Sequence, residues 1–104
     1  MKKECKFTII GNEWVLKRTD NMSDGLGGLC NVNTRTITIR SEYNYNRFVV
    51  VVSHELMHAV AFELGLVFEC NYPTDMYRVI MDHTQLDTFA SCCTVLLEIL
   101  KKMR

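Results

Sequence analysis

Two histidines and a glutamate stand close together in the sequence, and their types and spacing suit metal chemistry. The stretch His54-Glu55-Leu56-Met57-His58 has the pattern HExxH. On a helix His54 and His58 lie one turn apart on one face, about 5 to 6 Å apart at Cβ, so both imidazoles can bind one metal ion. Glu55 is rotated by about 100° and can reach a water at the metal without being a ligand. The pattern predicts a catalytic Zn²⁺ site with Glu55 as the general base.

The alternative without chemistry is that His54, Glu55 and His58 are ordinary helix residues. The surrounding segment, residues 46 to 64, is apolar nearly all round, so three polar side chains buried side by side there would need partners. An unpaired buried polar group costs about 1 to 3 kcal/mol. A metal ion supplies such a partner, and we therefore expect metal binding.

A third ligand must come from elsewhere in the fold, because two histidines do not complete a zinc site. His83 is the remaining histidine, and Asp87 lies four residues further along the same expected helix. His83 on the metal with Asp87 behind an imidazole would supply a ligand and its support. Carboxylates bind zinc equally well, so Asp87 itself, Asp82 and Glu69 compete with His83 for this position.

The first part of the chain, residues 5 to 40, is expected to form strands and turns. The clearest strand is 34 to 40, where Ile37 and Ile39 alternate with polar residues. The glycine-rich stretch 24 to 28 lacks the lysine of a phosphate-binding loop and is interpreted as a plain turn.

The second part is expected to be mainly helical. Residues 46 to 64 carry apolar side chains at helical spacing, and Gly65 follows where a helix commonly ends. Residues 66 to 80 contain a proline in a turn-rich stretch and are predicted as a loop or lid. A second long helix is predicted for 82 to 103, with Asp82 and Gln85 as a capping box and basic residues suited to its C-terminus: Lys101, Lys102 and Arg104.

Composition limits the partners. The 104 residues carry 12 Lys and Arg against 12 Asp and Glu, so net charge gives no reason to expect nucleic acid or an anionic membrane as a partner. The five cysteines form no CxxC pair and are expected to be reduced, with Cys92 and Cys93 in the core. With no membrane span or export signal in the sequence, we expect one α+β domain over residues 1 to 104, located in the cytoplasm.

The chain resembles the small zinc metallopeptidases of the ImmA/IrrE type, which include short single-domain members from phages and mobile elements. The likeness lies in Gly28-Leu29-Cys30-Asn31 before Thr36-Ile37-Thr38-Ile39, in the HExxH helix, and in a second helix rich in leucine. The resemblance implies a zincin-like fold, an antiparallel sheet packed on the HExxH helix and a C-terminal helix. Where the related pattern ExxxD places a glutamate ligand, this chain has His83, followed by Asp87.

The expected activity is hydrolysis of a peptide bond in a protein substrate, by family analogy a repressor or other regulator. Glu55 would take a proton from the attacking water and pass it to the leaving amine. Strand 34 to 40 either holds an extended peptide at the sheet edge or is an ordinary core strand. The oxyanion could be stabilised by a residue of the loop before the second helix: Tyr72, Tyr77 or Arg78.

Two other functions compete with this one. A non-catalytic protein could use zinc to tie its two helices together and bind a partner, although such a structural site needs no general base. A hydrolase of a non-peptide bond would use the same chemistry.

Overall fold

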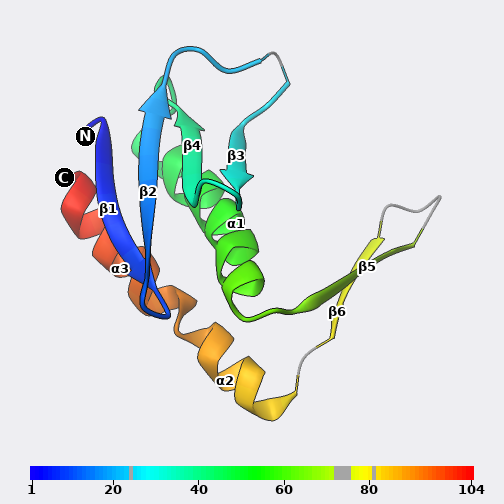
Figure 1. Ribbon diagram of the computed structural model, residues 1–104. Helices are drawn as coiled ribbons and strands as arrows, with labels where there is room; N and C mark the ends of the chain where they lie inside the picture. Colours follow the sequence, from blue (N-terminus) through cyan, green and yellow to red (C-terminus); the bar gives the residue numbers. More distant parts are fainter. Residues whose placement is uncertain (24, 72–75, 81) are drawn as a thin grey trace.

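The computed structural model describes residues 1–23, 25–71, 76–80 and 82–104, with the backbone alone for 67–71 and 76–80. The chain is an α+β protein (Figure 1). Its elements in chain order are β1 (Glu4–Ile9), β2 (Asn12–Thr19), β3 (Gly28–Asn31), β4 (Thr36–Arg40), α1 (Tyr45–Glu63), β5 (Val67–Asn71), β6 (Met76–Ile80), α2 (His83–Ala90) and α3 (Cys92–Met103).

The first four strands form one sheet in the order β1-β2-β4-β3. The expectation of a purely antiparallel sheet is wrong: β1 and β3 are antiparallel to their neighbours, but β2 and β4 are parallel. The reason is that β3 lies beyond β4, so the chain returns from β3 and places β4 beside β2 in the same direction. The predicted strand is confirmed as β4, with Ile37 and Ile39 buried, and it lies in the interior of the sheet. The edge strand on that side is β3.

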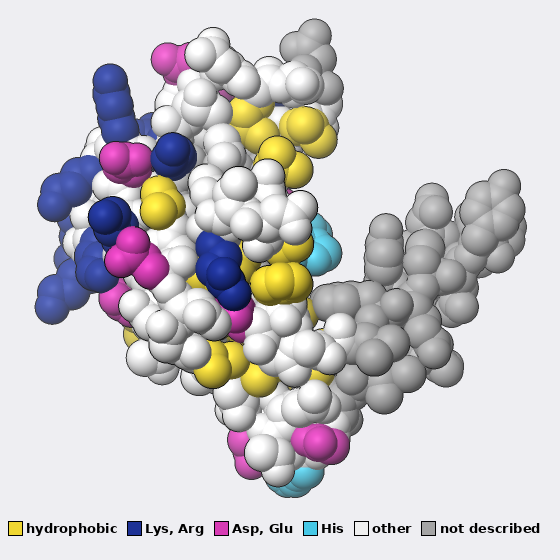
Figure 2. Space-filling view, viewed as in Figure 1, with side chains coloured by type: hydrophobic (Ala, Val, Ile, Leu, Met, Phe, Trp, Pro, Cys, Tyr) yellow, Lys and Arg dark blue, Asp and Glu magenta, His cyan; other side chains and the backbone are white. Residues whose placement is uncertain are grey.

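Helices α1 and α3 cover one face of the sheet, and Figures 1 and 2 look onto the opposite face. Helix α1 packs on β3 and β4, whereas α3 packs on β1 and on α1. The core between these layers is formed by side chains of β1, β2, β4, α1 and α3. They include Phe7, Ile9, Trp14, Leu16, Ile37, Ile39, Phe48, Val52, Leu56, Val60, Ile99 and Met103. No helix in the described part of the chain is long and apolar enough to cross a membrane.

Local signals set both ends of α1. The Asn44 side chain accepts a hydrogen bond from the Arg47 backbone N–H at 2.9 Å, which satisfies one of the free donors of the first turn. At the other end Gly65 has a φ of +67°, the left-handed conformation that favours glycine. The predicted helix is therefore confirmed nearly to the residue, even though four successive valines favour a strand by propensity alone.

The predicted second helix is two helices. The capping box is confirmed, since Asp82 Oδ1 accepts from the Gln85 N–H at 2.7 Å and Gln85 Oε1 accepts from the Asp82 N–H at 3.0 Å. At Ser91, however, the backbone N–H bonds to Thr88 O, three residues back, and the serine hydroxyl donates to the same oxygen at 2.6 Å. This tighter turn ends α2, in which no residue is buried.

The break at Ser91 also changes the expected burial of two cysteines. Cys93 is exposed and Cys92 is only half-buried, so the prediction that both belong to the core is wrong. The sequence stretch around them is apolar, but only the face of α3 that carries Ile99 and Met103 is turned to the core.

Residues 67–71 and 76–80 form an antiparallel hairpin, β5 and β6, where a loop or lid was predicted. Valine, phenylalanine, tyrosine and isoleucine residues flank the turn-rich centre of this segment, which is the pattern of a hairpin. Pro73, which suggested a loop, lies outside the described residues. The hairpin projects from the C-terminal end of α1, away from the four-stranded sheet (Figure 1).

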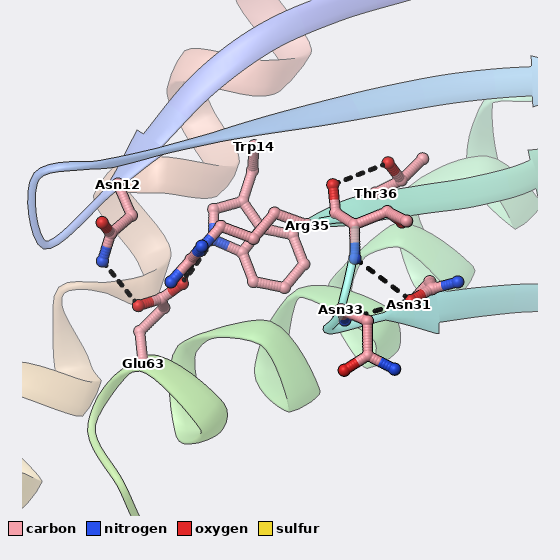
Figure 3. Close-up of polar contacts among 8 residues, drawn as sticks. Asn12, Trp14, Asn31, Asn33, Arg35, Thr36 and Glu63 are labelled. Carbon is pink, nitrogen blue, oxygen red and sulfur yellow. Dashed lines mark hydrogen bonds and ion pairs between the residues drawn. The ribbon is translucent and has the colours of Figure 1, made fainter.

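A buried carboxylate fastens the end of α1 to the sheet (Figure 3). Glu63, the last residue of α1, accepts hydrogen bonds from Asn12 Nδ2 at 2.7 Å, Trp14 Nε1 at 2.9 Å and Arg35 Nε at 2.6 Å. Its side chain is 5% exposed. Burial alone would raise the pKa of this carboxyl, but the hydrogen bonds from Arg35, Trp14 and Asn12 lower it below its ordinary value of 4.5.

The turn between β3 and β4 brings Arg35 to this carboxylate. Asn31 Oδ1 accepts from the backbone N–H groups of Asn33 and Thr34, at 3.0 and 3.2 Å, and so closes the turn (Figure 3). Arg35 itself has a φ of +49°, an uncommon conformation for a residue other than glycine. The carboxylate thus joins the end of α1 to two separate parts of the sheet.

Replacing Glu63 by glutamine should lower the free energy of unfolding by about 2 kcal/mol, because a neutral amide cannot accept all three hydrogen bonds or pair with Arg35. The pKa is lower in the folded chain, so the carboxylate contributes fully above about pH 4.5 and its contribution is lost as the pH falls through the folded-state value. Urea unfolding between pH 3 and 7 measures both effects. Glu13→Gln, in the exposed pair with Lys6, is the control and should change stability by under about 0.5 kcal/mol.

Candidate metal centre

The two histidines of the HExxH pattern face each other on α1. Their Nε2 atoms are 3.3 Å apart and their rings meet edge to face, with centroids 5.0 Å apart. Two nitrogens at 2.0–2.1 Å from one tetrahedral zinc ion lie about 3.3–3.4 Å apart. The separation of the two nitrogens is therefore the one that a shared zinc ion needs, and in the metal-free chain the same distance allows one ring to donate a hydrogen bond to the other.

The burial of the three motif residues differs from the expectation. His54 and His58 are exposed, the first with 69% of its side chain accessible, and Glu55 alone is buried. Helix α1 buries only the face toward the sheet, and other apolar residues of the outer face, Val50 and Met57 among them, are exposed as well. The argument from unpaired buried groups thus applies to Glu55 alone, and the case for a metal rests on the geometry of the two imidazoles.

Glu55 lies between α1 and the edge strand β3. Its side chain is 12% exposed, and its Oε1 is 4.0 Å from His54 Nε2. Gly28, the first residue of β3, allows this arrangement: a Cβ there would lie 2.8 Å from Val51 Cγ1 and 3.0 Å from Glu55 Cγ. The glycine-rich stretch is therefore more than a plain turn. A glycine inside a strand is a known sign of close backbone approach, and this signal could have identified Gly28 from the sequence.

An open cleft of about 660 Å³ lies between β3 and the C-terminal half of α1. Glu55 and His58 contribute its polar lining among mostly apolar neighbours: Gly28, Leu29, Cys30, Val32, Phe62, Gly65 and Leu66. Burial, with a smaller contribution from the Glu55 carboxylate, raises the pKa of the Cys30 thiol from 9.0 to about 11. The thiol is therefore neutral at physiological pH, and Glu55 is the acidic group that the described residues present to the cleft.

The structure does not bring His83 or Asp87 to this pair. Both are exposed on α2, and α2 packs on α3. Among the residues that the structure describes, no three His, Cys, Asp or Glu side chains lie close enough together to hold a metal ion. One long helix is predicted for residues 82 to 103, but the break at Ser91 separates α2 from α3, and α2 packs on α3.

The remaining candidate ligands, Asp82 and Glu69, and the candidate oxyanion residues lie before α2 and in the segment of the β5–β6 hairpin. The Asp82 carboxylate is engaged as the N-cap of α2. Glu69 lies in β5, opposite Arg78 of β6, and Tyr77 is opposite Cys70. The side chains of Glu69, Tyr77 and Arg78, and all of Tyr72, fall outside the described residues, so their expected roles stay predictions.

Comparison of the chain with protein-family models, with curated proteins and with solved structures found no match. The resemblance to ImmA/IrrE-type metallopeptidases therefore rests on the residues quoted for it. The geometry of the motif stands independently of that resemblance, because it follows from α1 and from β3.

Alanine at His54 or at His58 should lower the affinity for zinc on the order of 100-fold, because each change removes one of two ligands already held at the right separation. Competition with a chromophoric zinc chelator measures this directly. His83→Ala is the informative comparison and should lose less affinity than either. An equal loss would show that α2 moves to the pair when zinc binds and that His83 is the third ligand.

Gly28→Ala should lower the free energy of unfolding by about 1 to 3 kcal/mol, because the added methyl group meets Val51 and the stem of Glu55 and pushes β3 away from α1. Gly27→Ala is a matched control: its Cβ would meet the Tyr43 hydroxyl, the end of a side chain that can move, and should cost less than 1 kcal/mol. Urea unfolding compares the two variants. Equal costs would contradict the close approach at Gly28.

Proposed function

We propose that this chain is a zincin-like metallopeptidase that uses zinc and Glu55 to hydrolyse a peptide bond in a protein or peptide substrate. The observation that carries the proposal is that the HExxH motif combines two exposed histidines with a buried glutamate. Two exposed imidazoles lie at the separation that zinc requires, and a buried carboxylate lies 4.0 Å from one of them, at an open cleft.

The fit of zinc to this site is chemical as well as geometric. His54 and His58 would hold the ion through neutral Nε2 atoms, which are common zinc ligands. When bound, zinc supplies Lewis acidity that polarises a carbonyl and makes water a better nucleophile at neutral pH. A third protein ligand is still needed, and the candidates stay predictions. His83 and Asp87 would have to move with α2 to reach the pair, Asp82 is engaged as the N-cap of α2, and the Glu69 side chain lies outside the described residues.

Glu55 would act as the general base and then as the general acid. Its carboxylate accepts a proton from the attacking water and then donates it to the nitrogen of the leaving amine. Its position beside Gly28 of β3, with 12% of the side chain exposed, limits the positions that this side chain can take and shields it from bulk water. A general base held in one position is worth typically 10² to 10⁴ in rate.

The substrate can lie along β3. This strand is the last in the order β1-β2-β4-β3 and borders the cleft, so an extended peptide can add to its edge through backbone hydrogen bonds. Strand β4, the candidate for this role in the sequence, has β2 and β3 on its two sides and therefore has no free edge. Residues of the hairpin that follows α1, Tyr77 and Arg78, together with Tyr72, remain the candidates to stabilise the oxyanion.

The competing function is a zinc-stabilised interaction protein without activity. A structural zinc site is closed by four protein ligands. An exposed pair of histidines beside a cleft and a buried glutamate that is not needed as a ligand favour the catalytic alternative. We therefore keep the peptidase as the proposed function.

Glu55→Gln tests the proposal. The variant should bind zinc as the wild type does, because both imidazoles remain, but kcat/KM on a broad peptide library should fall on the order of 10³-fold, because the amide cannot accept the proton. Zinc content by mass spectrometry of the native protein is the control. Equal cleavage by both proteins would remove Glu55 from the mechanism, and no cleavage by zinc-loaded wild type would favour the interaction protein.

A further inference from the structure

Seven of the twelve lysine and arginine residues of this chain gather at one corner. We call the basic corner the set of seven exposed residues at the start of β1, in β2 and at the end of α3: Lys2, Lys3, Lys6, Lys17, Lys101, Lys102 and Arg104. Figure 2 shows Lys and Arg side chains together on the left, over the position of β1 and α3 in Figure 1.

Hydrogen bonds to backbone oxygens and the pairing of two strands hold the parts of the basic corner together. The Lys2 N–H donates to Met103 O at 2.9 Å, which joins the start of the chain to the end of α3. Lys102 Nζ donates to Lys6 O at 2.8 Å, across the edge of the sheet. Lys17 lies opposite Glu4 in the pairing of β1 with β2. The cluster is thus a consequence of the packing of α3 on β1.

Nearby carboxylates do not neutralise the basic corner. Seven cations stand there against three acidic residues: Glu4, Glu13 and Glu98. Asp20 also lines a hollow with Lys3, but Arg18 lines the same hollow and offsets its charge. Glu13 pairs with Lys6 at 3.8 Å and Glu98 with Lys102 at 2.8 Å. Among the described residues no ion pair involves Lys2, Lys3, Lys17, Lys101 or Arg104. The formal net charge of zero therefore hides an excess of four positive charges at one end and four negative charges over the rest.

We infer that the basic corner binds the phosphate backbone of double-stranded nucleic acid without sequence preference. Six of its seven cations are lysines, which act as flexible point charges and suit a row of phosphates. The expectation of no nucleic-acid partner rested on the net charge alone, and a local field depends on where the charges lie.

The makeup of the surface favours this partner over three others. Protein interfaces are centred on aromatic or large apolar anchors, single strands are bound by stacking on aromatic side chains, and membrane-surface helices insert apolar side chains. Among the described residues, the large aromatic side chains that are exposed, Tyr45 and Phe62, lie on α1 and outside the elements of the basic corner. The exposed large hydrophobic residues nearest to the basic corner in the sequence are Met1, Ile10 and Leu97.

Protection of an edge strand explains only part of the cluster. Lysines on β1 discourage pairing with a strand of another molecule, since β1 is an edge of the sheet. Lys17 lies in the interior strand β2, and Lys101 and Arg104 belong to the end of α3. Phosphate binding accounts for all of these positions together, and it does not depend on the proposed peptidase activity.

Fluorescence anisotropy with a labelled 20-base-pair DNA duplex of arbitrary sequence tests the inference. The chain should bind in 50 mM salt, and neutralising about four phosphates predicts a slope of about −3.6 for log K against log salt, so affinity should fall about 150-fold between 50 and 200 mM. Lys17→Glu should weaken binding in 50 mM salt at least fivefold, and the triple variant Lys3→Glu, Lys17→Glu, Lys101→Glu should abolish it. Should the triple variant fail to fold by circular dichroism, the single variants Lys3→Glu and Lys17→Glu decide the matter.

Arg47→Glu is the matched control, since it makes the same charge reversal at an exposed cation on α1, and it should change affinity less than twofold. An equal loss in this variant, or absence of duplex binding by the wild type in 50 mM salt, would overturn the inference. Binding to vesicles of phosphatidylserine and phosphatidylcholine without binding to the duplex would overturn it too, in favour of a lipid surface.

Discussion

The candidate centre depends on how closely α1 packs against the sheet. The helix buries Phe48, Val52, Leu56 and Val60, and each such side chain contributes about 1.5 to 3 kcal/mol when fully buried. Because a helix is rigid, the rotation that buries this row also sets the direction of every other side chain on it. The carboxylate at the end of α1 and the missing side chain at Gly28 then fix the distance between helix and strand.

That single rotation divides the HExxH motif into parts with different surroundings. The two histidines lie on the outer side of α1, where a metal ion and a substrate can reach them, and Glu55 lies on the inner side against β3. A ligand must be accessible when the metal enters, whereas a base works best when neighbours hold it in place. Helical geometry provides both conditions within two consecutive residues, because they differ by about 100° around the axis.

Features that depend on neighbouring residues could be predicted from the sequence. They include α1 with its C-terminal glycine, the capping box of α2, and β4 with its alternating isoleucines. The parallel pairing of β2 with β4 could not, because strand order depends on contacts between distant segments. The hairpin was missed because its turn residues outweighed the β-forming residues on both sides. The break at Ser91 was missed because apolar spacing continues through it, while the backbone changes to a tighter turn.

Two histidines and a glutamate stand on one helix at the spacing of a metal site, and this follows from the sequence because 3.6 residues per turn is a local property of the backbone. Four other features arise when distant segments pack: Glu55 faces the sheet, β3 rather than β4 borders the cleft, Glu63 secures the helix, and seven cations gather at one corner. These outcomes required the packing of residues far apart in the chain, and local propensities carry no information about which distant segments meet.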